Sequence, residues 1–282
     1  MRWQGRKQSS NVEDRRGQGS RIGGKSTGII GIIILLVGAY YGVDLSGVVG
    51  SPAAGTQVTQ PSTLNSQQEA QLNELARVVL ADTETTWSQY FANNNARYTP
   101  PTMVLYTAGT QTACGTGQAA MGPFYCPQDR KVYLDLSFYE DMRKQLGASG
   151  DAAFAYVIAH EVGHHVQNLL GILPQVNQAQ QGASAKQANA LSVKLELQAD
   201  CFAGIWARQA NEQFGSLEPG DVEEAIGAAE AVGDDTLMAN AGRAVVPDAF
   251  THGSSEQRMK WFQRGLQSGQ MGQCDTFKAA TL

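Results

Sequence analysis

The stretch VIAHEVGHHVQ, residues 157–167, contains two histidines that flank a glutamate in the order H-E-x-x-H. On a helix, residues four apart share one face about 6 Å apart along the axis, so His160 and His164 can bind one divalent ion. Glu161 lies beside that face, where its carboxylate can take a proton from water. With four His and 13 Glu in 282 residues, the pattern arises by accident in roughly three of a thousand such chains. The stretch therefore predicts a metal site on a helix rather than a polar surface patch.

A third metal ligand is expected, because catalytic zinc usually has three protein ligands and one open position. The residues after His164 lack the glycine and the third histidine of the metzincin pattern. The segment LSVKLELQADCFAGIWARQ, residues 191–209, instead places Glu196 and Asp200 four residues apart on one face of a predicted helix. One carboxylate can bind the metal, while the other accepts the second ring N–H of a ligand histidine.

The other two histidines lie outside the H-E-x-x-H pattern. His165 diverges around the helix from the metal face, which predicts a structural or supporting role. His252 precedes a predicted helix start at Ser254 or Ser255 and can donate a hydrogen bond to the oxyanion of a tetrahedral intermediate. Arg258, six residues later, can pair with an active-site carboxylate.

Charge is distributed unevenly along the chain. Residues 1–27 contain seven Lys or Arg against Glu13 and Asp14, whereas the remainder has 14 basic and 24 acidic residues. An acidic body argues against nucleic acid as a partner, because binding to phosphates needs clustered Lys and Arg. The uncharged run GIIGIIILLVGAYYGV, residues 28–43, predicts a membrane anchor, with a cleaved signal peptide or a buried core helix as alternatives. The positive-inside rule then places the head in the cytoplasm and the body outside it.

Four cysteines, an even number without a C-x-x-C pair, suit disulfides in an oxidising compartment. Cys114 and Cys126 close a short loop and form the first expected pair, which leaves Cys201 with Cys274. Four buried free thiols are the alternative, and four cysteines permit three pairings.

The distribution of charged and apolar residues divides the chain into a basic head (1–27), a transmembrane anchor (28–48), a flexible linker (49–66) and a domain (67–282). Apolar periodicity predicts helices over 67–91, 151–170, 188–213, 221–232 and 254–267, strands over 103–107 and 131–138, and a mobile connector over 178–190. We expect an α-rich α+β domain with a small antiparallel sheet. KVYLDLSF, residues 131–138, is the predicted edge strand over the motif helix.

The chain resembles a bacterial family of membrane-anchored proteins described as putative neutral zinc metallopeptidases. The resemblance extends over nearly the whole length and rests on MRWQGRKQSSNVEDRRG, ACGTGQAAMGPFYCPQDRKVYLDLSFY, VIAHEVGHHVQ, LELQADCFAGIWA and THGSSEQR. More distantly, it is similar to membrane gluzincin peptidases of the prenyl-protein type. This resemblance implies a zincin-like domain with Glu196 as the third zinc ligand, Asp200 as its helper and His252 as the oxyanion stabiliser.

The expected function is hydrolysis of peptide bonds by zinc-activated water, with Glu161 as the general base and a peptide or protein as the substrate. The expected location is the inner membrane, crossed once, with the catalytic domain on the periplasmic or extracellular side. A membrane-anchored scaffold with a structural zinc is one alternative, although it has no use for a general base. A cell-wall amidase is the other.

Overall fold

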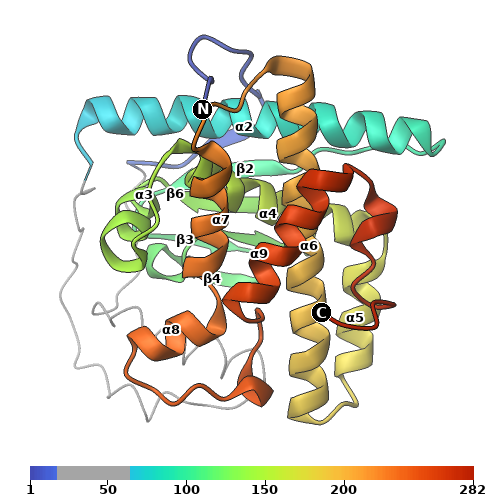
Figure 1. The fold of residues 1–282 in the computed structure, drawn as a ribbon. Helices are drawn as coiled ribbons and strands as arrows, with labels where there is room; N and C mark the ends of the chain where they lie inside the picture. Colours follow the sequence, from blue (N-terminus) through green and yellow to red (C-terminus); the bar gives the residue numbers. More distant parts are fainter. Residues whose placement is uncertain (18–63) are drawn as a thin grey trace.

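Long helices form the framework of the computed structural model, which describes residues 1–17 and 64–282. In Figure 1, α2 (Ser66–Asn93) lies across the top, and α6 (Ala185–Phe214) runs down from it next to α9 (Ser255–Ser268). The motif helix is α4 (Asp151–Leu169). The predicted long helices agree with these bounds to within a few residues. The remaining helices are α3 (Phe138–Asp141), α5 (Ile172–Gln180), α7 (Asp221–Ala231) and α8 (Asp234–Asn240), with short helical turns at 119–121, 142–146, 247–249 and 271–274.

Capping side chains fix where α6 and α9 begin. Ser184 accepts a hydrogen bond from the backbone N–H of Gln187, whose side chain accepts one from Ser184 N. This capping box starts α6 inside the predicted connector at 178–190, so the bounds of that prediction are wrong: α5 ends at Gln180 and α6 begins at Ala185. Ser254 forms the same box with Gln257, which confirms the predicted helix start after His252.

The main sheet has the strand order β1-β2-β6-β5, with β1 (Val12–Asp14), β2 (Thr102–Tyr106), β5 (Phe124–Cys126) and β6 (Lys131–Asp135). β2 pairs in parallel with β1 and β6, and only β5 is antiparallel to its neighbour. The predicted antiparallel sheet is therefore wrong in direction. The chain between β2 and β6 is long enough to return to the same end of the sheet, as a parallel crossover requires, and it contains the hairpin β3 (Gly109–Thr112) and β4 (Gly115–Gln118).

The predicted edge strand is also misplaced. β6 lies between β2 and β5, so its hydrogen-bonding groups are used on both sides. β5 takes the outer position at that end of the described sheet. An extended peptide that adds to this end would meet β5 rather than β6.

The motif helix lies at the centre of the fold. α4 packs against α2, α6 and α7, and against β5 and β6 of the sheet. α6 and α9 cross very closely: a Cβ atom at Gly265 would lie 1.9 Å from the carbonyl oxygen of Cys201, and one at Gly204 would lie 2.1 Å from that of Phe262. Glycine is required on both helices at this crossing, which lies in the second half of α9, and nearer the start of α9 Arg258 reaches Asp200 of α6.

Both predicted disulfides are present. Cys114 pairs with Cys126 and Cys201 pairs with Cys274, so no cysteine of the chain is free. The first holds the β4 side of the hairpin to the edge strand β5. The second ties α6 to the turn at 271–274 after α9. The fold is thus a helix-rich α+β domain closed by two covalent links.

Residues 1–17 pack on this domain, which differs from the separate basic head expected for residues 1–27. Trp3 is buried in the main hydrophobic core, and β1 is a strand of the main sheet. The predicted anchor at 28–48, and the linker up to residue 63, lie outside the described residues. Within residues 1–17 and 64–282, no helix is both long enough and apolar enough to cross a membrane.

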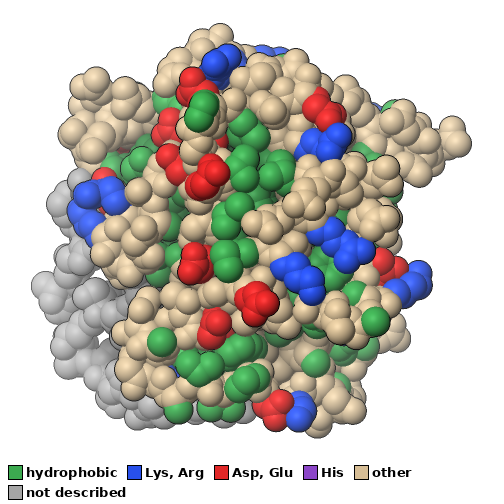
Figure 2. All heavy atoms as spheres, viewed as in Figure 1, with side chains coloured by type: hydrophobic (Ala, Val, Ile, Leu, Met, Phe, Trp, Pro, Cys, Tyr) green, Lys and Arg blue, Asp and Glu red, His purple; other side chains and the backbone are tan. Residues whose placement is uncertain are grey.

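Acidic side chains outnumber basic ones over much of the face in Figure 2, near the N-terminus and over α7 and α8. Apolar groups lie between them, and Lys and Arg gather mainly toward α6 and α9. The acidic composition of the body is therefore visible on this surface.

Candidate metal centre

Two helices bring the predicted ligands together. His160 and His164 of α4 and Glu196 of α6 each offer a ligand atom, and these atoms all lie within 4.8 Å of one another. Nε2 of His160 lies 3.0 Å from Oε2 of Glu196 and 3.1 Å from Nε2 of His164, which lies 3.4 Å from Oε1 of Glu196. The spacing of the motif and the position of α6 together produce this cluster.

Close packing of α4 against α6 makes these distances possible. A Cβ atom at Gly163 would lie 3.1 Å from the carbonyl oxygen of Ala199 and 3.2 Å from its Cα. A larger residue between the two histidines would push α6 away and carry Glu196 with it. The small residue at Gly163 therefore helps to set the distance between the two histidines of α4 and Glu196 of α6.

Hydrogen bonds fix both rings in one tautomer. Nδ1 of His160 lies 2.8 Å from Oδ1 of Asp200, and Nδ1 of His164 lies 2.9 Å from Oε1 of Gln167. Because each of these oxygens is an acceptor, both Nδ1 atoms carry a proton, and the Nε2 atoms that face Glu196 are left to bind either a second proton or a metal ion. Three electron-pair donors then face one point, which requires a positive charge there.

The pKa values of the cluster also show that a positive charge is favoured between the three ligand side chains. Burial opposes protonation of His160, but the negative charges of Asp200 and Glu196 outweigh it and raise its pKa to about 10. Burial also opposes ionisation of Glu196, yet His164 and His160 hold the pKa of its carboxyl well below the usual range. The group thus binds a proton strongly, and a metal ion replaces such a proton in sites with these ligands.

The dimensions suit zinc. Two zinc–ligand bonds of about 2.05 Å at a tetrahedral angle place their donor atoms about 3.3 Å apart. The three separations among His160, His164 and Glu196 lie between 3.0 and 3.4 Å. Two histidines and one carboxylate also leave the fourth position of a tetrahedral site free for a water or a substrate.

Asp200 is fully buried and contacts the His160 ring on the side away from the metal-facing Nε2 atom. Arg258 of α9 donates to both of its oxygens at 2.9 Å, and the hydroxyl of Tyr156 donates to Oδ1 at 2.6 Å. Burial opposes ionisation of Asp200, but the charges of Arg258 and His160 hold its pKa at about 2. The predicted pairing of Arg258 with a carboxylate is thus present. Tyr156, one turn before His160, was not anticipated, although it lies on the same helix face as the ligands.

Glu161 lies beside the cluster without being part of it. Its side chain is buried, and among residues 1–17 and 64–282 its carboxylate forms no hydrogen bond. Burial raises the pKa of Glu161, while the nearby histidines partly oppose the increase. A buried carboxylate whose pKa lies above the ordinary value is suited to accept and return a proton near neutral pH.

His252 reaches the same region from the segment before α9. Its side chain is about half exposed, and Asp234 of α8 holds it: Oδ1 lies 3.1 Å from Nδ1, and Oδ2 accepts the backbone N–H groups of Thr251, His252 and Gly253. Partial desolvation lowers the pKa of His252, but the hydrogen bond to Asp234 and the charge of Glu196 raise it overall. Asp234 was missed because it lies 18 residues away in the chain without a local sequence signal.

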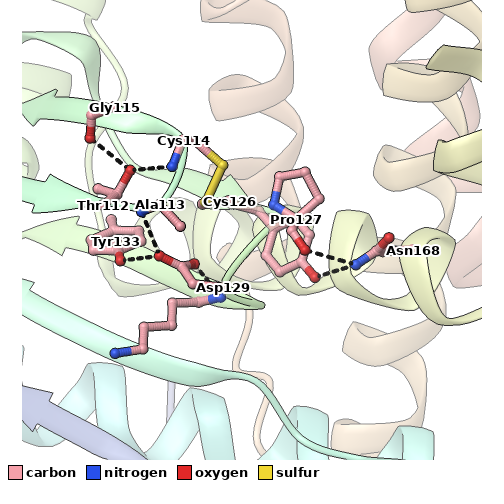
Figure 3. Close-up of a disulfide and its surroundings, with 11 residues drawn as sticks. Thr112, Ala113, Cys114, Gly115, Cys126, Pro127, Asp129, Tyr133 and Asn168 are labelled. Carbon is pink, nitrogen blue, oxygen red and sulfur yellow. Dashed lines mark hydrogen bonds between the residues drawn. A yellow bond between two sulfur atoms is a disulfide. The ribbon is translucent and has the colours of Figure 1, made fainter.

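His165 faces the opposite way and connects the motif helix to the sheet. Its Nε2 donates to the carbonyl oxygen of Thr99 at 2.7 Å, and its Nδ1 accepts from the hydroxyl of Tyr125 on β5 at 3.0 Å. Burial lowers its pKa to about 4, which keeps the ring neutral. Asn168 donates to the Tyr125 hydroxyl and, as Figure 3 shows, to the carbonyl oxygen of Pro127, next to the Cys114–Cys126 disulfide. The expected structural role of His165 fits these contacts.

The sequence of this chain matches a family over nearly its full length. The profile of the family described as "Putative neutral zinc metallopeptidase" covers residues 1–277. The chain belongs to this family. Membership implies zinc as the cofactor, and the geometry of His160, His164 and Glu196 is consistent with that metal.

Two relatives show how far the similarity extends. The chain is 52% identical to the uncharacterized protein YpfJ of Escherichia coli (strain K12), over 98% of this chain and 99% of that protein. It is 44% identical to the uncharacterized protein Rv2575 of Mycobacterium tuberculosis (strain ATCC 25618 / H37Rv), over 66% of this chain and 65% of that protein. No solved structure is significantly similar to it.

Proposed function

We propose that this member of the zinc metallopeptidase family hydrolyses peptide bonds in peptides or proteins. The observation that carries the proposal is the convergence of His160 Nε2, His164 Nε2 and Glu196 on one point, with the carboxylate of Glu161 buried next to it. A zinc held only for structure is usually closed by four protein ligands. Three ligands and an adjacent carboxylate are the composition of a hydrolytic site.

His160, His164 and Glu196 would hold the zinc, which supplies a Lewis acid and a water of lowered pKa when it is bound. Glu161 accepts a proton from the attacking water and donates it to the leaving amine. His252, oriented by Asp234, donates from Nε2 to the oxygen that becomes negative in the transition state. Asp200 holds the His160 ring in place through Nδ1, and Arg258 keeps Asp200 ionised.

The edge strand β5 supplies a place for the substrate. β5 packs on α4, where the hydroxyl of Tyr125 contacts His165, the residue that follows the ligand His164 in that helix. An extended peptide that pairs with the outer side of β5 would lie along the motif helix. Backbone pairing of this kind suits peptides in general and leaves sequence preference to the side chains around the site.

We also propose that the domain works outside the cytoplasm, in contact with a membrane through the apolar residues 28–43. Two disulfides support this location, because such bonds persist in oxidising compartments. The membrane contact rests on the sequence of residues 28–43.

The proposal is tested by zinc content and casein cleavage, measured on the purified protein and on Glu161→Gln. The variant should keep one zinc per chain and lose on the order of a hundredfold or more in turnover. Glu223→Gln is the matched control, since Glu223 is an exposed carboxylate on α7. A parent protein that binds zinc and cleaves no peptide would favour the scaffold alternative, and cleavage of cell-wall amides alone would favour the amidase.

A further inference from the structure

We infer that residues 1–17 are part of the metal-binding domain and lie on the same side of the membrane as residues 64–282. The inference does not depend on the peptidase activity. It replaces the expectation that the basic head is cytoplasmic while the domain is external. It also identifies the part of the domain that faces the lipid surface.

The first observation is the burial of the N-terminal segment. Trp3 is 5% exposed, and its indole N–H donates to Oδ2 of Asp151, the first residue of the motif helix α4, at 2.6 Å. The backbone N–H of Arg2 donates to Ser216 O, and that of Ser9 donates to Arg77 O. Burial of a large aromatic side chain stabilises a domain substantially, so this segment is docked rather than in incidental contact.

The second observation is backbone pairing. β1 pairs with β2 in a parallel register, with Val12 opposite Met103 and Asp14 opposite Leu105. The backbone N–H of Met103 donates to Asn11 O, and that of Arg15 donates to Leu105 O. Without β1, one edge of the main sheet would lose its neighbouring strand.

The third observation explains the positive charge of the head. Arg6 lies 2.7 Å from Oδ1 of the buried Asp82, and its guanidinium lies over the Phe214 ring. Glu13 is held by Arg15 and by Lys131 of β6, which lower its pKa to about 2. Several basic side chains therefore bind the domain, and their charge is not a reliable sign of a cytoplasmic position.

The fourth observation concerns where the chain leaves and returns. Arg16 lies 3.0 Å from Glu69 in the first turn of α2, so residues 17 and 64 emerge from the same part of the domain. Trp3 and Leu64 also line one small cavity of about 170 Å³. A single crossing between these residues would separate them by the bilayer, which is about 30 Å thick in its apolar part. Two full crossings would need about 40 apolar residues, far more than the run at 28–43 supplies.

The edge that carries Arg16 and Glu69 is therefore the part of the domain closest to the lipid surface. Both disulfides lie in the same domain, so residues 1–17 share the oxidising compartment proposed for it. The head and the domain would stay together on the outer leaflet.

The inference is tested by labelling the full-length protein in spheroplasts with a membrane-impermeant maleimide. The parent protein has no free thiol, so Ser10→Cys in the head and Lys186→Cys on α6 each provide one exposed target. Both variants should label before lysis. Labelling of both only after lysis would keep the head with the domain but refute the external location. Labelling of one before lysis and the other only after it would overturn the inference.

A second experiment tests the docking itself. Arg6→Glu places a negative charge next to Asp82 and should lower the melting temperature of the full-length protein by about 5 °C or more. Lys7→Glu is the matched control, because it makes the same charge change at an exposed neighbour. Equal melting temperatures for the two variants would show that the head does not dock.

Discussion

Oδ1 of Asp200 lies 2.8 Å from Nδ1 of His160, so a carboxylate on α6 fixes the orientation of a ring on α4. One turn earlier on α6, Glu196 faces the Nε2 atoms of both histidines. The two carboxylates look alike in the sequence, yet only one of them can touch the metal. The other acts through the ring.

Variants of these two residues should therefore differ. Glu196→Ala removes a ligand and should abolish stoichiometric zinc binding. Asp200→Asn should keep one zinc per chain and weaken its affinity by about 10- to 100-fold, the usual effect of losing a group that orients a ligand. Competition with a chelator measures both. Undiminished zinc in Glu196→Ala together with loss of zinc in Asp200→Asn would make Asp200 the metal ligand and Glu196 the orienting group.

His165 gives a prediction about the helix that carries the ligands. His165→Ala removes the donor to the carbonyl oxygen of Thr99 and the acceptor of the Tyr125 hydroxyl proton, and should lower the free energy of unfolding by about 2–4 kcal/mol. Zinc stoichiometry should remain at one, because the ring faces away from the cluster. Denaturant unfolding and metal analysis of the same preparation test this. A variant of parental stability that has lost its zinc would instead make His165 a ligand.

Sequence reasoning located the motif helix and its partner because both carry long, regular apolar patterns. The spacing of His160 and His164 is set by helix geometry alone, so it could be read without a structure. The choice of Glu196 over Asp200 as the metal ligand needed the resemblance to a known family. Residues four apart share a helix face, and only the way α4 packs on α6 decides which of the two carboxylates meets the metal. Gln167 could have been found, because it lies three residues after His164 on the same face.

The sheet was harder to predict. Strand direction depends on the long connection between β2 and β6, and its length fits either direction. The strand β1 was not predicted, because it lies in a segment whose positive charge suggested a cytoplasmic head. Arg6 and Arg16 were counted in the basic head, whereas each has a carboxylate partner far away in the chain. Long-range pairing of this kind has no local signal.

Asp234 should act as a positioning residue for His252. Asp234→Asn removes the charge that orients the ring, and should lower kcat by about 10-fold or more with little change in KM or zinc content. Asp235→Asn is the control, because Asp235 binds Ser255 and does not touch His252. Steady-state kinetics on a peptide substrate separate the two variants. Equal kcat values for Asp234→Asn and Asp235→Asn would remove Asp234 from this role.

The buried carboxyl of Asp82 should make the free energy of unfolding depend on pH. Burial raises its pKa to about 6 from an ordinary value of 3.8, despite the nearby Arg6. Between these values the folded state binds the proton more strongly than the unfolded state, so the free energy of unfolding decreases as pH rises from about 4 to about 6. The contribution of this group is about 3 kcal/mol.

Asp82→Asn removes that contribution to the pH dependence. The free energy of unfolding of the variant minus that of the parent should therefore increase between pH 4.5 and pH 6.5. Urea unfolding at several pH values measures it. A constant difference across this range would mean that the carboxyl of Asp82 titrates normally.

The Cys201–Cys274 disulfide is linked to the metal centre through a chain of hydrogen bonds. The side chain of Gln198 donates to the carbonyl oxygen of Cys274 at 3.0 Å and accepts from Gln167 at 3.1 Å. Gln167 in turn fixes the ring of His164. Movement of the turn that holds Cys274 would therefore reach a zinc ligand.

Replacement of Cys201 and Cys274 by serine should lower the free energy of unfolding by about 4 kcal/mol, since the bridge closes a loop of 73 residues. It should also weaken zinc binding by about 10-fold, because Gln198 loses its fixed partner and the His164 ring becomes less well oriented. The double replacement of Cys114 and Cys126 is the control: it opens a loop of 12 residues, should cost about 3 kcal/mol, and should leave zinc affinity unchanged. Chelator competition and urea unfolding on both double variants supply the comparison. Equal zinc affinities in the two would show that the hydrogen-bond chain from Cys274 to His164 carries no coupling.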